Sequence, residues 1–187
     1  MGEALITAGQ RITASMLNGL PVALANLATG SVTSTTTETV VGTLAAAIPA
    51  GDAAVNSGYE IRVSGTADGA ATSPTLTLAL RLDTAAGAVL VTHSAVTYLA
   101  AGGTGRGFFI AATFHATAVG VSGKLFGVSQ LLENVSKTGN ANVDSQNNQN
   151  NTTIDTTVAH NIVLTAKWSA ASASNTARTL AGDIVRI

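Results

Sequence analysis

The sequence predicts an all-β protein, a jelly-roll-like antiparallel β-sandwich behind a short N-terminal arm that carries one small helix. The stretch from Thr75 to Asp83 has leucine at every even position from 76 to 82, with Thr, Ala, Arg or Asp between them. Successive side chains of a strand point to opposite faces, so this alternation indicates a half-buried strand. Roughly eight to ten segments of this kind follow one another with no long helix, which favours a sandwich or jelly roll.

The first 30 residues differ from the rest, and we predict an arm over 1–30 and a β-domain over 31–187. Thr13 suits the N-cap of a brief helix from Ala14 to Asn18, which Gly19 and Pro21 would end. The apolar residues of this region could form one stripe: Ile12, Met16, Leu17, Leu20 and Leu24. So small a piece is not stable alone, so we expect it to dock on its own domain, on sister copies or on a larger assembly.

From Ser31 onward the composition shifts to Thr, Val, Ser and Gly, which favours strands and turns. Residues 31–41 form a polar strand or linker, and the polar stretch 32–40 would be an edge strand suited to pairing with a neighbouring subunit. The further expected strands are residues 42–48, 59–64, 75–83, 88–93, 108–117, 121–132, 154–158, 160–168 and 175–187. Two sets of side chains are each expected to share a face: Phe108 with Ile110 and Phe114, and Ile162 with Leu164 and Trp168.

Residues 140–151 carry Asn or Gln at eight of twelve positions. Such a composition does not favour burial, so we predict an exposed loop or tip there. Its most polar part is Asn147, Asn148, Gln149 and Asn150.

Charge is sparse, at 10% of residues with a formal net charge of -1. A typical soluble domain has about 25% charged residues. We therefore expect self-association or incorporation into a larger assembly rather than a sparsely charged secreted monomer. The nine Lys and Arg are scattered, which argues against a nucleic-acid partner. No membrane partner is expected, since no apolar run has the length of a transmembrane helix, and no secretory signal is recognisable.

The sequence has no cysteine, so we expect neither disulfides nor a thiolate metal site. The three histidines, His93, His115 and His160, lack metal-binding spacing, and no cofactor or metal is expected. The acidic residues are isolated, and a glycosidase pair such as Glu60 with Asp83 stays open without being singled out. The glycine-rich residues 102–107 lack the ending of a phosphate loop. We therefore expect that the protein is not an enzyme.

Three aromatic residues, Tyr59, Tyr98 and Trp168, could form a sugar-stacking platform. Aromatic residues make up only 4% of the chain, so we favour a role as core anchors.

Residues 6–18, ITAGQRITASMLN, resemble the start of small virion proteins of tailed bacteriophages, and residues 166–176 resemble their closing hairpin. The resemblance implies a trimeric fibre, spike or decoration protein in the virion, with a displayed β-domain and no catalytic residues. Its partners would be other capsid or tail proteins and, for a receptor binder, a host surface glycan. The arm residues implied in attachment are Ile6, Arg11, Ile12, Met16, Leu17 and Leu20.

The sequence leaves several alternatives open. Head and tail locations fit equally well, as do receptor binding and cementing of the shell. The competing class is a monomeric carbohydrate-binding β-sandwich, with or without weak hydrolase activity. A cell-surface adhesin domain is a third reading, weakened by the lack of a recognisable secretory signal.

Overall fold

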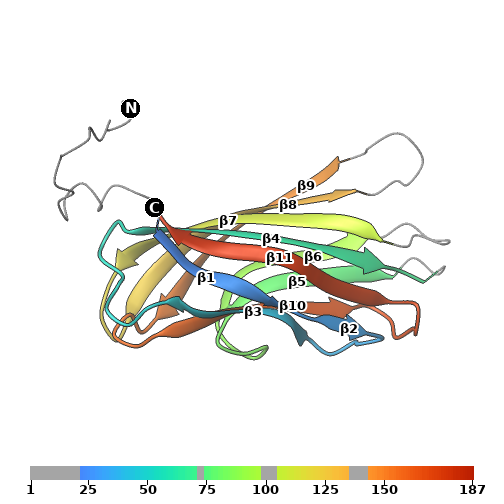
Figure 1. Ribbon diagram of the computed structural model, residues 1–187, viewed down its shortest axis with the longest axis horizontal. Helices are drawn as coiled ribbons and strands as arrows, with labels where there is room; N and C mark the ends of the chain where they lie inside the picture. The colour runs from blue at the N-terminus through green and yellow to red at the C-terminus, as the bar shows by residue number, and fades with distance from the viewer. Residues whose placement is uncertain (1–21, 71–73, 98–104, 135–142) are drawn as a thin grey trace, which may run out of the picture.

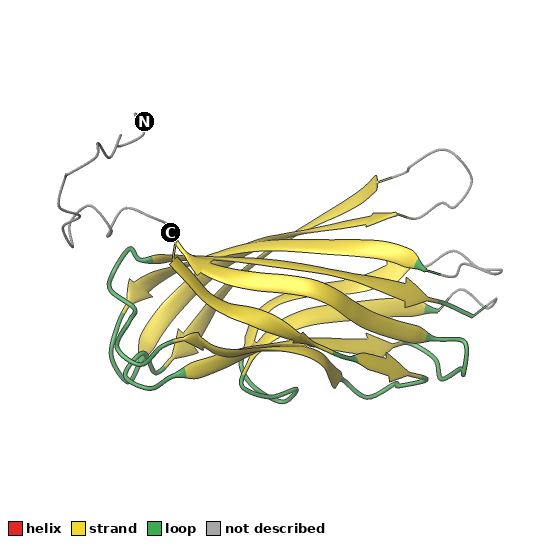
Figure 2. Ribbon diagram, in the orientation of Figure 1, coloured by secondary structure: helices red, strands yellow, loops and turns green. Residues whose placement is uncertain are grey.

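The computed structural model describes residues 22–70, 74–97, 105–134 and 143–187, and these form eleven β-strands and no helix (Figure 1, Figure 2). The predicted all-β class is confirmed, whereas the predicted arm helix lies outside the described residues. The strands in chain order are β1 (Val22–Thr29), β2 (Ser31–Thr33), β3 (Thr39–Ile48), β4 (Gly58–Asp68), β5 (Thr75–Leu82), β6 (Val89–Thr97), β7 (Arg106–Ala118), β8 (Gly123–Asn134), β9 (Val143–Ile154), β10 (His160–Trp168) and β11 (Thr176–Arg186).

All pairings between the described strands are antiparallel, in the order β6-β5-β10-β3-β1-β11-β4-β7-β8-β9, with β2 beside β11. Strand β1 belongs to two layers, because its first residues pair with β11 and its last residues with β3. One layer is β6-β5-β10-β3 and the other is β11-β4-β7-β8-β9. The sheet therefore folds at β1 into a sandwich, as predicted.

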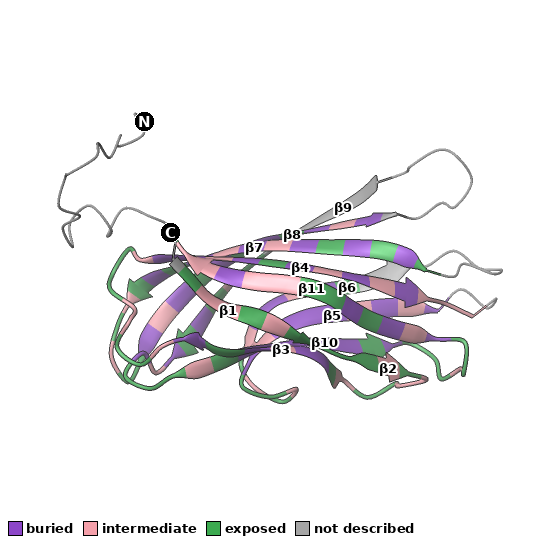
Figure 3. Ribbon diagram, viewed as in Figure 1, coloured by how far each residue is buried: buried purple, intermediate pink, exposed green. Residues whose placement is uncertain are grey.

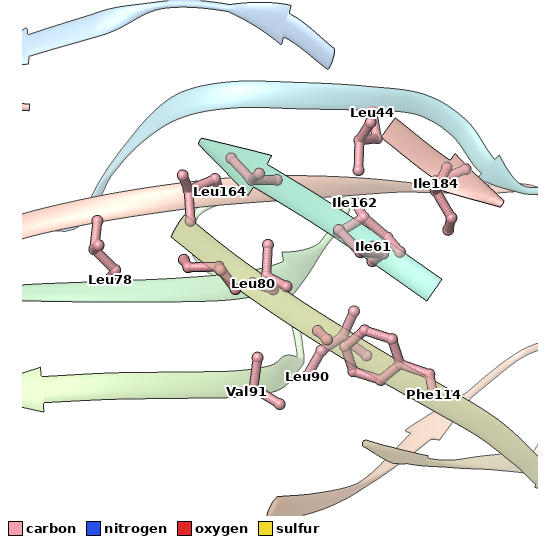
Figure 4. Close-up of a cluster of buried hydrophobic side chains, with 14 of the residues drawn as sticks. Leu44, Ile61, Leu78, Leu80, Leu90, Val91, Phe114, Ile162, Leu164 and Ile184 are labelled. Carbon is pink, nitrogen blue, oxygen red and sulfur yellow. The ribbon is translucent and has the colours of Figure 1, made fainter. Parts of the chain in front are cut away.

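The core lies between the two layers and is almost entirely aliphatic and aromatic. Figure 4 shows side chains from β3, β5, β6 and β10 meeting those from β4, β7 and β11. The four leucines of β5 are all buried, which confirms that they form the apolar face of a strand, as their alternation predicts: Leu76, Leu78, Leu80 and Leu82. The two predicted shared faces are confirmed as well, since all six side chains are buried: Phe108, Ile110, Phe114, Ile162, Leu164 and Trp168.

Strand β10 is buried on both faces from Ile162 to Ala166 (Figure 3). Its outer face is covered by Glu38, in the turn between β2 and β3, which accepts a hydrogen bond from Thr165 (2.5 Å). Glu38 also forms a two-point ion pair with Arg81 of β5 (2.5 and 2.7 Å). Burial would raise the pKa of Glu38, but the hydrogen bonds from Arg81 and Thr165 outweigh it and lower the pKa. This half-buried pair fixes the turn onto the sheet.

The side of the sandwich opposite β1 is closed by side chains instead of a strand ladder. Strands β6 and β9 end the strand order and lie beside each other without pairing. Asn150 Nδ2 donates to the Val89 carbonyl oxygen (2.6 Å), and Thr152 Oγ1 donates to the same oxygen. Deeper inside, His93 of β6 and Ser129 of β8 share a hydrogen bond of 2.8 Å. We call these five residues the seam.

Several predicted boundaries are wrong. The stretch from residue 32 to 40 is no edge strand: β2 ends at Thr33, a turn follows, and β3 lies inside the sheet between β1 and β10. Residues 155–159 form a turn, although 154–158 was expected to be a strand. Strand β1 occupies residues assigned to the arm, so the sandwich starts at Val22 and not at residue 31. Pairing with β3 and with the distant β11, and not local sequence, makes this segment a strand.

Trp168 is 1% exposed and belongs to the core cluster. We expect Trp168→Ala to lower the free energy of unfolding by about 3–5 kcal/mol, because the cavity left behind cannot fully collapse. Urea unfolding followed by circular dichroism measures this difference. The matched control is Leu180→Ala on the exposed face of β11, which should change stability by less than about 0.5 kcal/mol. Equal effects of the two substitutions would contradict the core assignment.

Candidate functional site

A shallow hollow of about 430 Å³ lies where β1 ends at Thr29 and β2 begins at Ser31. We call this part of the sandwich the corner. It is lined by hydroxyl groups, one glycine and one guanidinium: Thr29, Gly30, Ser31, Thr33, Thr176, Arg178 and Thr179. The corner depends on Thr179, whose Oγ1 donates to the Val41 carbonyl (2.7 Å) and accepts from Gly30 N (2.9 Å). Gly30 is required there, because an added Cβ would lie 2.9 Å from that same carbonyl oxygen.

Asp68 supports one wall of the hollow from outside it. It accepts a hydrogen bond from Thr176 Oγ1 (2.7 Å) and another from Gly105 N, and Arg178 approaches it at 3.4 Å. Burial would raise the pKa of Asp68, but these donors outweigh it and lower the pKa. Arg178 is exposed and only loosely paired, so its guanidinium can also reach a ligand in the hollow.

The chemistry of this hollow suits a polar ligand and not catalysis. Hydroxyl and backbone groups can donate to and accept from a polyhydroxylated molecule, and the guanidinium adds an anion-binding donor. No carboxylate or imidazole is among the described residues that line it, so the lining offers no general acid or base near neutral pH.

The outer face of the β11-β4-β7-β8-β9 layer carries a second depression, of about 290 Å³, beside Glu60, Ala111, Thr113, Val128 and Gln130. Small residues of β7 leave this space open, and Glu60 binds Arg62 of the same strand at 2.7 Å. Three large apolar side chains of this layer are between 37% and 40% exposed: Phe109, Phe126 and Val128. The layer thus presents a broad surface with mixed apolar and polar character.

The buried pair of His93 and Ser129 is the polar contact inside the seam. His93 is 1% exposed, and its Nδ1 has no hydrogen-bond partner among the described residues. Burial lowers the pKa of His93 to about 4, so the ring is neutral near pH 7. The pair joins the two layers, because β6 belongs to one and β8 to the other.

The structure does not bring the other candidate residues together. His160 bonds to Asp83 (2.8 Å) at the end of β5, while Glu60 lies on the other layer with Arg62, so no glycosidase pair is formed. His115 is exposed on β7. Within residues 22–70, 74–97, 105–134 and 143–187, no cluster of three or more His, Asp or Glu side chains could hold a metal. The described part of the chain also has no helix that is long and apolar enough to span a membrane.

Two of the three aromatic residues suggested for a sugar-stacking platform cannot take part in one. Tyr59 and Trp168 are both buried, so neither side chain can stack on a sugar, and the core reading is the correct one for them. Tyr98 lies outside the described residues.

The predicted Asn/Gln loop is wrong in its conformation. Residues 143–154 form strand β9, paired with β8 along its whole length. This places Asn147, Asn148, Gln149 and Asn150 in a strand. Gln149 is exposed as expected, whereas Asn150 is half-buried and belongs to the seam. The predicted attachment residues lie outside the described residues: Ile6, Arg11, Ile12, Met16, Leu17 and Leu20.

Sequence reasoning missed the hydroxyl-lined hollow. Its two walls come from residues 29–33 and 176–179, which are distant in the chain and meet through the pairing of β2 with β11 and the hydrogen bonds between Gly30 and Thr179. The richness of both stretches in Thr and Ser was visible, but it indicated only strands.

Comparisons with known proteins give no family. No family model matches the sequence, and no curated protein matches it. Among solved structures, lectin UEA-II complexed with galactose is 9% identical with a TM-score of 0.41, covering 90% of this chain and 98% of the lectin chain. Lectin I-B4 from Griffonia simplicifolia in its metal-free form is 6% identical with a TM-score of 0.42, covering 86% and 93%.

A structure of infectious bursal disease virus, Gx strain, is 9% identical with a TM-score of 0.26, covering 90% of this chain and 41% of the viral chain. All three comparisons are too distant to bear on function. The β-sandwich rests on the strand pairing described above.

The seam predicts a pH dependence of stability. The pKa of His93 is about 4 in the folded protein and 6.5 for the free side chain, so the unfolded chain binds more protons between these values. The contribution of His93 to the free energy of unfolding should therefore be fully present above about pH 6.5. It should fall by up to about 3 kcal/mol as the pH drops to 4. Urea unfolding at several pH values measures this loss.

His93→Gln should flatten this part of the profile, because the glutamine amide does not titrate. His115→Gln, at an exposed position of β7, serves as the matched control and should keep the wild-type slope. If the His93 variant retained the full slope, the acid sensitivity would come from carboxylates and not from the seam.

Proposed function

We propose that this chain is a non-catalytic structural protein that works as one copy in a larger assembly, of the kind found in tailed-bacteriophage virions. Its N-terminal residues would attach it to other copies or to other virion proteins, and its sandwich would be displayed. The observation that carries the proposal is an exposed surface with few charges and many large apolar side chains. Such a surface on a free monomer is a liability, whereas in an assembly it becomes an interface.

Two further features support this proposal. The described residues offer no metal cluster, and the His93–Ser129 and His160–Asp83 pairs serve structural contacts. The resemblance of residues 6–18 to the arms of virion proteins gives the attachment segment its place in the chain.

The solution mass of the full-length protein tests the proposal. Light scattering coupled to size exclusion should find one defined oligomer, with three copies as the expected number. A mass of one chain across the accessible concentration range would remove the basis of the proposal. Any fragment used for display experiments should begin at Val22 and not at residue 31, because removing β1 would separate the two layers.

The second candidate function is carbohydrate binding, and the hydroxyl-lined hollow is the observation that favours it. Its lining can exchange hydrogen bonds with sugar hydroxyls, and Arg178 can bind an acidic sugar. The described residues around it contribute no exposed aromatic ring for stacking, so the affinity should be modest.

A glycan array probed with the full-length protein tests this candidate. We expect any bound glycan to be lost, by roughly tenfold or more in affinity, in Arg178→Ala, since a charge-assisted hydrogen bond contributes about 1.5–3 kcal/mol. Arg62→Ala is the matched control, because Arg62 is an equally exposed arginine on another part of the same layer. Equal binding by both variants would place the sugar elsewhere, and an empty array would count against carbohydrate binding.

A further inference from the structure

Five large apolar side chains are exposed together at one end of the sandwich. They come from the β3–β4 loop, the β7–β8 turn, the β9–β10 turn and the C-terminus, and each is between 46% and 73% exposed: Val55, Val119, Val121, Val158 and Ile187. Figure 1 shows these connections at the same end as the C-terminus and the start of β1. We call these five residues the apolar end.

The loops of the apolar end are fastened to one another by backbone hydrogen bonds. Thr156 accepts from Gly51 N (2.9 Å) and donates to the Gly120 carbonyl (3.0 Å). Gly58 and Ile187 exchange N–H to carbonyl bonds of 3.3 and 2.9 Å. The side chains therefore stand on a fixed surface and not on separate, freely moving loops.

Two of the charged groups at this end pair with each other. Asp52 and Arg186 form an ion pair at 2.5 Å, and the Tyr59 hydroxyl donates to Asp52 at 3.0 Å. The surface thus offers apolar contact without a free charge from this cluster, which suits an apolar and weakly charged partner.

The chain itself supplies a segment with this chemistry. Strand β1 begins at Val22, which pairs with Arg186, so residues 1–21 join the sandwich at the apolar end. Within these 21 residues only Glu3 and Arg11 are charged. The apolar side chains recur through the segment at Ile6, Ile12, Met16, Leu17 and Leu20. Fully extended, the segment would reach at most about 70 Å, far enough to contact a neighbouring copy.

We propose that residues 1–21 of one copy bind the apolar end of a second copy, and this inference rests on the assembly function proposed above. Binding of the segment to its own end would leave a monomer with few charges and several exposed apolar side chains, which is why we place the segment on a second copy. The contact between two different surfaces of identical chains is heterologous. Such contacts form a ring when the rotation between copies closes and a filament when it does not, and the defined oligomer proposed above corresponds to a closed ring.

Light scattering of full-chain variants tests the inference. Val121→Asp with Val158→Asp removes the apolar end, and Ile12→Asp with Met16→Asp removes the apolar arm. Each double variant should have the mass of one chain, while thermal unfolding stays within a few degrees of the wild type. Leu180→Asp, an exposed apolar residue of β11 outside the apolar end, is the control and should assemble like the wild type.

Mixing the two double variants distinguishes exchange between copies from binding within one chain. The end variant still has an intact arm and the arm variant an intact apolar end, so the mixture should form a one-to-one complex with twice the mass of a single chain. If the mixture stays monomeric while the wild type assembles, the arm-to-end contact is wrong. An oligomer that persists in both double variants would also overturn this contact and leave the assembly function standing, whereas a monomeric wild type would overturn both.

Discussion

The sharing of one strand between two layers is the constraint on which the rest of this structure depends. Because β1 pairs first with β11 and then with β3, the sheet has to bend within eight residues. A side-chain hydroxyl makes the bend possible where the ladder is interrupted. Thr179 Oγ1 accepts a hydrogen bond from Gly30 N and donates one to the Val41 carbonyl oxygen. The same interruption opens the hydroxyl-lined hollow on the outside of the corner. The candidate ligand site is thus lined partly by the residues that shape the corner of the sandwich.

The opposite side of the sandwich is closed by side-chain hydrogen bonds. Strands β6 and β9 approach without a ladder, so side chains make the contacts on this side. Asn150 and Thr152 donate to the Val89 carbonyl oxygen, and the side chains of His93 and Ser129 bond to each other. These are a few side-chain hydrogen bonds, whereas a backbone ladder joins each neighbouring pair in the strand order. The corner at β1 is therefore the covalent and hydrogen-bonded hinge of the sandwich, and the seam is the side from which we expect it to open first.

Sequence patterns predicted those strands whose burial is one-sided or complete. The alternating leucines of β5 and the apolar faces of β7 and β10 report directly on a core beside them. Strand β9 escaped detection because it ends the strand order and is rich in Asn and Gln, which resembles a loop composition. Strand β1 and the hollow escaped because both depend on pairing with β11, more than 100 residues away, which no local pattern encodes. The prediction of an assembling protein rested on composition, which gives the character of the surface but no location for an interface.

The structure shows where the exposed apolar side chains lie. The exposed apolar side chains of the described residues concentrate in the outer face near Phe109 and Phe126 and at the apolar end. The apolar end is built from loops that are joined to one another by backbone hydrogen bonds, and it contains the ion pair of Asp52 with Arg186. It also adjoins the point where the N-terminal segment enters, so the segment and its proposed binding surface are brought together by the pairing of β1 with β11. The placement of β1 beside the last strand therefore determines the position of the corner, of the hollow and of the end through which we propose that copies assemble.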